Sequence, residues 1–145
     1  MDSQAFCEAM ALGVRIISCW RFQWRPGMRL YKAGGWCAEH GDIADKGYFM
    51  RVPESLPNGG YPDAWPALTD AATRGALLSL VRESWSDDRA WLEATNRYYA
   101  FNENGANCCE PAWILHVLDQ TAQTYRKIAG ATEAEALLCA LEMSP

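Results

Sequence analysis

The segment over residues 130–141 carries the pattern that most constrains the fold. Thr132 and Glu135 stand at the spacing of a capping box, in which the hydroxyl and the carboxylate each bind a backbone amide of the first helical turn. The apolar residues that follow recur at intervals of three and four, namely Ala134, Leu137, Leu138 and Leu141. This spacing places them on one face of a helix. That face must pack on another apolar layer, and we expect the layer to be a β-sheet.

Another helix is predicted over residues 71–85. Asp70 is a favourable N-cap, and one face of the helix would hold Leu77, Leu80, Val81 and Ser84. Gly75 destabilises such a helix by about 1 kcal/mol relative to alanine, which suggests close backbone packing at that position. A short first helix is predicted over residues 3–12, with Gly13 as its end.

Strands are predicted from β-branched and aromatic residues in short, partly alternating segments. These segments are residues 14–24, 28–33, 47–52, 96–102, 113–119 and 124–128. By periodicity alone a helix also fits residues 112–125. We favour two strands there, because β-branched residues are frequent and Asp119-Gln120-Thr121 suits a hairpin turn.

These elements predict an α+β fold in which two or three helices pack on an antiparallel meander. With 145 residues the chain is expected to be one domain. Residues 53–66 contain four prolines and an Asn-Gly-Gly run, which predicts a loop. The loop would join an N-terminal half, residues 1–52, to a C-terminal half, residues 67–145.

Charge is distributed unevenly along the chain. The whole sequence has a net charge of −5, which makes duplex nucleic acid an unlikely partner. Residues 1–60 contain seven basic and six acidic side chains, whereas residues 61–145 contain six basic and twelve acidic ones. Residues 9–38 hold five basic side chains and no acidic one. This basic stretch is also rich in aromatic residues.

The expected location is the cytoplasm. The first twenty residues lack the cationic start of a secretory signal, and no apolar run approaches the roughly 20 residues that cross a bilayer. We therefore expect no membrane association. The six cysteines are expected to be reduced thiols in such a compartment.

Three blocks of the sequence resemble a family of small uncharacterised proteins of tailed phages and prophages. They are WRPGM at residues 24–28, PALTDAATRGALLSLVRESW at residues 66–85 and GATEAEAL at residues 130–137. The order of predicted elements is also similar to a phage domain described as an α-β-α sandwich. The resemblance implies an accessory protein acting in the cytoplasm of a host bacterium, and it implies no catalytic residue. Residues 15–23 and the pair Cys108-Cys109 depart from the family pattern.

Residues suited to catalysis or metal binding are few. The common phosphate-binding, dinucleotide-binding, serine-hydrolase and zinc-protease motifs are absent, and the only histidines are His40 and His116. His116 lies in an apolar segment and is expected to be a hydrogen-bonded core residue. We assign no catalytic residue and no cofactor. A zinc site could be drawn from Cys37, His40, Cys108 and Cys109, but adjacent cysteines on an extended chain point to opposite faces, so free thiols are the expectation.

The basic stretch is the first candidate binding site. Its proposed contact residues are Arg21, Trp24, Arg25, Arg29, Lys32 and Trp36. Arginine and lysine pair with phosphates while aromatic faces stack on bases, so a nucleotide or short single strand could bind here. The alternative is that the aromatic rings fill the core and the arginines form its solvated rim.

The acidic half offers a second candidate. Asp87 and Asp88, together with Glu93, Glu103 and Glu110, could face a basic groove of a protein partner. The alternative is a solvated loop. Aromatic anchors for such a partner are available in Trp65, Trp85, Trp91 and Trp113.

Together these features predict a non-enzymatic accessory protein that binds a host bacterial protein, most plausibly as an inhibitor of an anti-phage defence component. Two alternatives stay open: a protein that sequesters a nucleotide or short nucleic acid, and a virion or assembly component.

Overall fold

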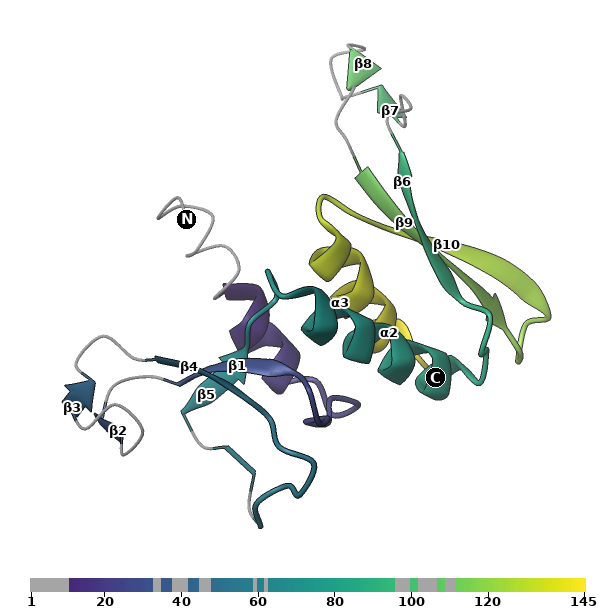
Figure 1. Cartoon of the computed structure of the whole chain (residues 1–145). Coiled ribbons are helices and arrows are strands. Elements are labelled where there is room, and N and C mark those ends of the chain that lie inside the picture. Colours follow the sequence, from purple (N-terminus) through teal and green to yellow (C-terminus); the bar gives the residue numbers. More distant parts are fainter. Residues whose placement is uncertain are drawn as a thin grey trace. The chain divides into compact units, whose positions relative to one another are not determined.

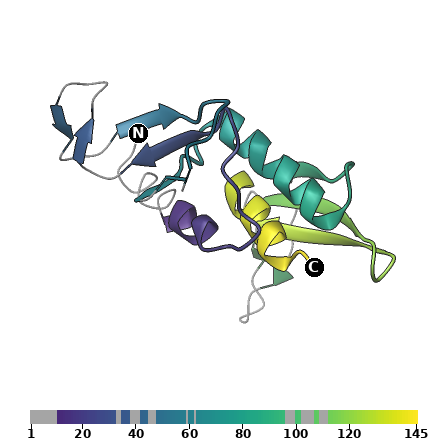
Figure 2. The ribbon, with the colours of Figure 1, turned by 90° about the horizontal axis from the view of Figure 1, so that it is seen from below.

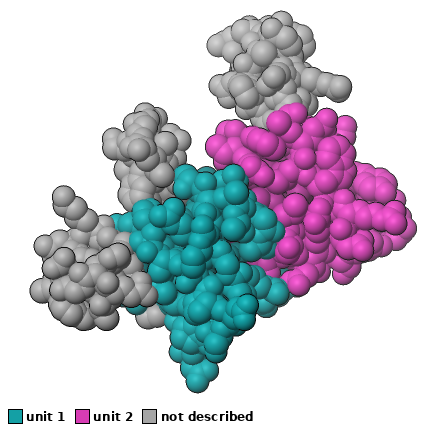
Figure 3. Space-filling view, in the orientation of Figure 1, with its two compact units in different colours: residues 1–76 teal, residues 77–145 magenta. Residues whose placement is uncertain are grey.

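We describe the chain from a computed structural model (Figure 1). The structure describes residues 11–32, 35–37, 42–44, 48–58, 60–61, 63–95, 100–101, 107–108 and 112–145. The chain divides into two compact units, residues 1–76 and residues 77–145, which Figure 3 colours separately. Each unit is described by itself below.

Unit 1 is built on a three-stranded antiparallel sheet with the order β4-β1-β5. Its strands are β1 (Arg29–Lys32), β4 (Tyr48–Arg51) and β5 (Ala64–Pro66). A separate two-stranded pair consists of β2 (Gly35–Cys37) and β3 (Asp42–Ala44). The core of the described part is formed by Ile16, Met28, Leu30, Val52, Ala64, Ala67 and Leu68.

The N-terminal helix differs from the prediction. Residues 11–17 are helical, so Gly13 does not end a helix and residues 14–24 are not a strand. Gly13 permits a close approach instead: a Cβ there would lie 3.1 Å from both the Pro66 carbonyl oxygen and the Trp65 ring. The β-branched residues that suggested a strand are divided between two sides of the helix, with Ile16 fully buried and Val14 and Ile17 exposed. The predicted start over residues 3–10 lies outside the described residues.

Strand β5 occupies the end of the segment that was predicted to be a loop. Its Pro66 pairs with Leu30 of β1, and β5 lies at an edge of the sheet. Proline lacks the amide that a central strand must donate, but an edge strand tolerates it. The loop prediction is therefore wrong for residues 64–66.

Helix α2 (Ala71–Trp85) has the predicted bounds. Asp70 accepts a hydrogen bond from the Thr73 amide at 3.0 Å, as an N-cap does. Gly75, however, is exposed, and a Cβ built on it would have no atom within 4 Å. The expected close packing at Gly75 is therefore wrong. The division between the units falls after Ala76, so α2 contributes residues to both.

Unit 2 has its own antiparallel sheet, with the order β10-β9-β6. The strands are β6 (Trp91–Thr95), β9 (Ala112–Asp119) and β10 (Thr124–Gly130), and a small pair is formed by β7 (Ala100–Phe101) and β8 (Asn107–Cys108). Both strands predicted over residues 113–128 are confirmed. Strand β6 was not predicted, and most of the predicted strand over residues 96–102 lies outside the described residues.

Helix α3 (Glu133–Met143) packs against β9 and β10 (Figure 2). Thr132 caps it by accepting a hydrogen bond from the Glu135 amide at 3.1 Å. All four residues of the predicted apolar stripe are buried. A Cβ on Gly130 would lie 2.9 Å from the Ala136 Cα, so the contact between β10 and α3 requires glycine at this position.

Side-chain alternation gives the unit 2 sheet a covered face and an open face. The covered face holds Leu115, Val117 and Ile128, which are buried with Leu77, Leu80, Val81, Trp85, Leu137, Leu138 and Leu141 of the two helices. The indole N–H of Trp85 donates to the Ala140 carbonyl at 2.8 Å. The open face holds Trp91, His116 and Lys127, which are direct cross-strand neighbours, and also Ile114, which is buried.

The α+β fold with antiparallel sheets is confirmed. Within the described residues, no helix combines the length and the apolar character that crossing a membrane requires.

Candidate binding surfaces

Among the described residues of unit 1, the most exposed apolar surface runs along the helix at residues 11–17 and the turn after it. We call Val14, Ile17, Trp20 and Arg21 the N-terminal patch. The exposed fractions of the three apolar residues are 47%, 41% and 74%. They recur every three residues, and the chain continues past the helix through i to i+3 hydrogen bonds from Cys19 to Ile16 and from Phe22 to Cys19. The three side chains therefore follow one another along the outer side of this segment.

Arg21 adds a cation to this patch. Its guanidinium carbon lies 3.7 Å from the centre of the Trp20 ring, in the range of a cation–π contact. Tryptophan and arginine are the residue types that contribute most to protein interfaces when they are buried by a partner. The patch thus combines an exposed aromatic anchor, a stacked cation and two aliphatic neighbours.

Trp24 and Arg25 occupy a different environment. Trp24 packs edge-to-face against Phe22 and Tyr61, with ring centres 5.1 and 5.6 Å away, and is partly buried. Burial raises the pKa of Tyr61. The Arg25 guanidinium donates to the Gln23 side chain at 3.3 Å. These contacts fit the alternative in which the aromatic rings contribute to packing.

Arg29 and Lys32 lie on β1 and point to opposite faces of the sheet, because they are three positions apart. Arg29 is exposed, and its guanidinium carbon lies 4.3 Å from the centre of the Phe49 ring. Tyr31 lies between Phe49 and Trp65 at ring-centre distances of 5.1 and 5.4 Å. The structure therefore builds an aromatic row across β4, β1 and β5, with Arg29 at one end.

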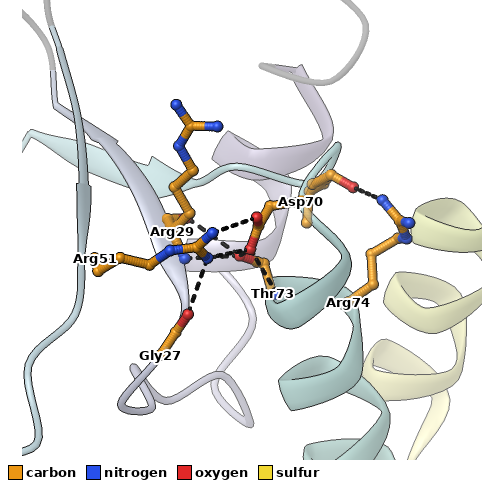
Figure 4. A network of polar contacts seen from close by, with 7 residues as sticks. Gly27, Arg29, Arg51, Asp70, Thr73 and Arg74 are labelled. Carbon is orange, nitrogen blue, oxygen red and sulfur yellow. Dashed lines mark hydrogen bonds and ion pairs between the residues drawn. The ribbon is translucent and has the colours of Figure 1, made fainter.

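A polar network anchors this sheet to the start of α2 (Figure 4). Both terminal nitrogens of Arg51 donate to the Asp70 carboxylate, the Nη2–Oδ1 distance being 2.8 Å. Arg51 also donates to the Gly27 carbonyl, and the Thr73 hydroxyl accepts from the Arg29 amide at 2.7 Å. The hydrogen bonds from Arg51 and then from Thr73 hold the pKa of Asp70 at about 2, against an ordinary 3.8, although burial acts in the opposite direction. This network positions β1.

The two candidate acidic residues of unit 2 have different roles. Both oxygens of Asp87 accept backbone hydrogen bonds, one from Arg89 and one from Leu118 of β9. Asp87 therefore braces the turn after α2 against the sheet. Asp88 is exposed. Of the other acidic residues considered, Glu93 pairs with His116, and Glu103 and Glu110 lie outside the described residues.

The open face of the unit 2 sheet presents two exposed aromatic residues. Trp91 is 49% exposed and stacks on the His116 ring, with centres 4.1 Å apart and planes 14° apart. His116 Nε2 lies 2.8 Å from Glu93 Oε2. Tyr125 of β10 is 79% exposed. Of the tryptophans considered as anchors, Trp91 is the most accessible, whereas Trp85 is buried by the helices and unsuited to a partner.

The candidate metal site was drawn from the side chains of Cys37, His40, Cys108 and Cys109, which lie outside the described residues, as does the side chain of Trp36 in the basic stretch. In the part of the chain that the structure describes, no group of three or more histidine, cysteine or acidic side chains could hold a metal ion.

No family model, curated protein or solved structure matches the chain.

The sequence treated the residues of the basic, aromatic stretch as one site, but only Arg15 and Arg29 of its five cations are fully exposed, whereas Arg21, Arg25 and Lys32 are half-buried. The structure separates Arg21, Trp24 and Arg29 into three environments. Val14, Ile17 and Tyr125 were not singled out. The spacing of three residues between Val14, Ile17 and Trp20 is typical of one side of a helix. It was not used, because this segment was predicted to be a strand.

Proposed function

We propose that this protein acts by binding another protein, in the setting of a phage accessory factor that occupies a host bacterial protein. The resemblance to phage proteins supports the setting, and a component of anti-phage defence is the class of partner it favours. The observation that carries the binding role is Trp20, a large apolar side chain that is 74% exposed with an arginine stacked on its ring. Most of this side chain stays in water in the free protein, and a partner that covers it gains the energy of its burial.

The basic stretch indicates the chemistry of this partner. Arg21 stacks on Trp20, and Arg15 is an exposed cation of the helix that carries Val14 and Ile17, so this patch favours an acidic protein. Complementary charge of this kind raises the association rate and makes it dependent on salt.

The test is capture from lysates of bacterial strains that carry anti-phage defence systems. The tagged wild-type chain should retain a stoichiometric partner, and Trp20→Ala should reduce the retained amount about tenfold or more. Met143→Ala is the control, because it removes another exposed apolar side chain from a different unit, outside the proposed binding surfaces. Equal recovery of the partner with the wild type and with Trp20→Ala would show that the N-terminal patch does not bind it, which contradicts the proposal.

A second candidate function is supported by the aromatic row across β4, β1 and β5. Arg29 stacked on Phe49 beside Tyr31 and Trp65 resembles the combination of cation and aromatic rings that holds nucleotides. A nucleotide at this row should quench tryptophan fluorescence, and Arg29→Met and added salt should both weaken the effect. Unchanged fluorescence across mononucleotides and short oligonucleotides would exclude this function.

A further inference from the structure

Strand β10 forms one edge of the unit 2 sheet. The sheet order is β10-β9-β6, and β10 pairs with β9 without interruption from Thr124 opposite Asp119 to Gly130 opposite Trp113. In an antiparallel pair, alternate residues direct their backbone N–H and C=O groups away from the partner strand. The outer side of β10 therefore presents a row of backbone donors and acceptors.

The strand is long, and its first four residues are accessible, whereas Ile128 and Gly130 are buried. The side chains of residues 124–127 are all exposed, and Tyr125 is 79% exposed. Proteins commonly protect an edge by shortening the strand, by inserting proline or by a bulge. Strand β10 has seven residues, contains no proline and keeps a regular register throughout. Its protection rests on two adjacent cations, Arg126 and Lys127.

Arg126 and Lys127 determine which kind of strand can pair with the edge of β10. Antiparallel association of two copies through the middle of β10 would bring Arg126 and Lys127 of one copy close to those of the other, and facing like charges destabilise a sheet. An acidic strand would instead gain attraction. Arg126 already forms an ion pair with Asp119 at 3.1 Å, so Lys127 is the cation best placed to recognise an incoming carboxylate.

The neighbour of Lys127 on the same face is Tyr125, because side chains alternate along a strand. We propose that the outer edge of β10 binds an extended acidic segment of a partner protein by strand addition. The segment places an acidic side chain opposite Lys127 and an apolar one, two residues away, opposite Tyr125. The proposal uses unit 2 alone and does not depend on the N-terminal patch.

The probe for this site is the peptide acetyl-Thr-Ile-Thr-Glu-Thr-Ile-Thr-amide, in which isoleucine stands two residues to either side of the acid and suits both strand directions. A second peptide has lysine in place of the glutamate. Both are titrated at low salt into the full-length ¹⁵N-labelled protein, and binding is measured from the backbone amide shifts. The variants are Lys127→Glu and, as a control with the same charge change at another exposed position of unit 2, Arg89→Glu.

We expect amide shifts concentrated on β10 and binding of the acidic peptide about fivefold tighter than that of the lysine peptide. Lys127→Glu should reverse this preference, whereas Arg89→Glu should preserve it. Three results would overturn the proposal: no shifts on β10 at millimolar peptide, equal affinity for the two peptides, or dimerisation of the wild-type protein through β10 in sedimentation. Because no host protein is involved, these results are separate from the outcome of the lysate capture.

Discussion

At the scale of single residues, Asp70 connects three parts of unit 1 through one carboxylate. It caps α2 by accepting from Thr73, and it holds Arg51 of β4 through two hydrogen bonds. Arg51 in turn donates to the Gly27 carbonyl in the turn before β1. The carboxylate is 11% exposed and the guanidinium is 54% exposed, so solvent screens part of the attraction.

Replacing Asp70 with asparagine isolates this ion pair, because asparagine is an equally good N-cap. The folded-state pKa of about 2 lies below the ordinary 3.8, so the pair stabilises the fold above pH ~4 and is lost as the pH falls towards 2. We expect Asp70→Asn to reduce the free energy of unfolding at pH 7 by about 1–2 kcal/mol, after allowance for screening. Urea unfolding at pH 7, 4 and 3 should show this difference shrinking with acid. A difference that stays constant with pH would contradict the assignment.

Gly130 is constrained by packing, since a Cβ there would meet the backbone of α3 at Ala136. We expect Gly130→Ala to destabilise the protein by about 1–3 kcal/mol, the range for overpacked sites. Thermal unfolding followed by circular dichroism measures the effect. Ala129→Ser is a suitable control, because the neighbouring Ala129 is exposed. A variant as stable as the wild type would show that β10 and α3 can separate without cost.

At the scale of elements, the same substitution in α2 has the opposite expected sign. Gly75 is exposed in the helix, and a Cβ there has open space. Alanine is favoured over glycine in a helix by about 1 kcal/mol, so Gly75→Ala should raise the free energy of unfolding by roughly that amount. Comparison with Gly130→Ala in one urea series tests both environments. Destabilisation by Gly75→Ala would indicate that this position is packed.

Elements with a local signal were predictable from the sequence. Helix α2 has an N-cap and a regular apolar face, α3 has Thr132 and its stripe, and β9 and β10 are rich in β-branched residues. The helix at residues 11–17 was not recognised, because Val14, Ile16 and Ile17 place apolar groups on two sides and so weaken the helical period. Strand β6 is short, and its apolar and polar residues do not alternate regularly, so it gives no clear strand pattern. Its structure depends on pairing with β9.

The candidate surfaces were less predictable, because exposure depends on the tertiary packing. Trp20 and Trp85 are the same residue type, yet Trp20 is 74% exposed and Trp85 is 2% exposed. Asp87 and Asp88 are adjacent, but only the backbone geometry of the turn brings the amides of Arg89 and Leu118 to the Asp87 carboxylate. Charge patterns indicate a region, and the fold decides which side chains in it remain accessible.

At the scale of the whole molecule, α2 links the two compact units through the chain itself. Its first turns supply Thr73 to unit 1, where the hydroxyl accepts from the Arg29 amide. Its later turns supply Leu77, Leu80 and Trp85 to the core of unit 2. The six residues of α2 that belong to unit 1 are too few to form a stable helix alone.

Loss of unit 2 should therefore remove the helix that anchors β1, and we expect a single unfolding transition for the whole chain. The backbone amide signals of Leu30 in β1 and Leu115 in β9 report on the two units during urea titration. They should disappear together in the wild type, and Gly130→Ala, which lies in unit 2, should shift both to the same lower urea concentration. If the Leu30 signal persists after the Leu115 signal is lost, unit 1 holds its structure with only the first part of α2, and the coupling through this helix is absent.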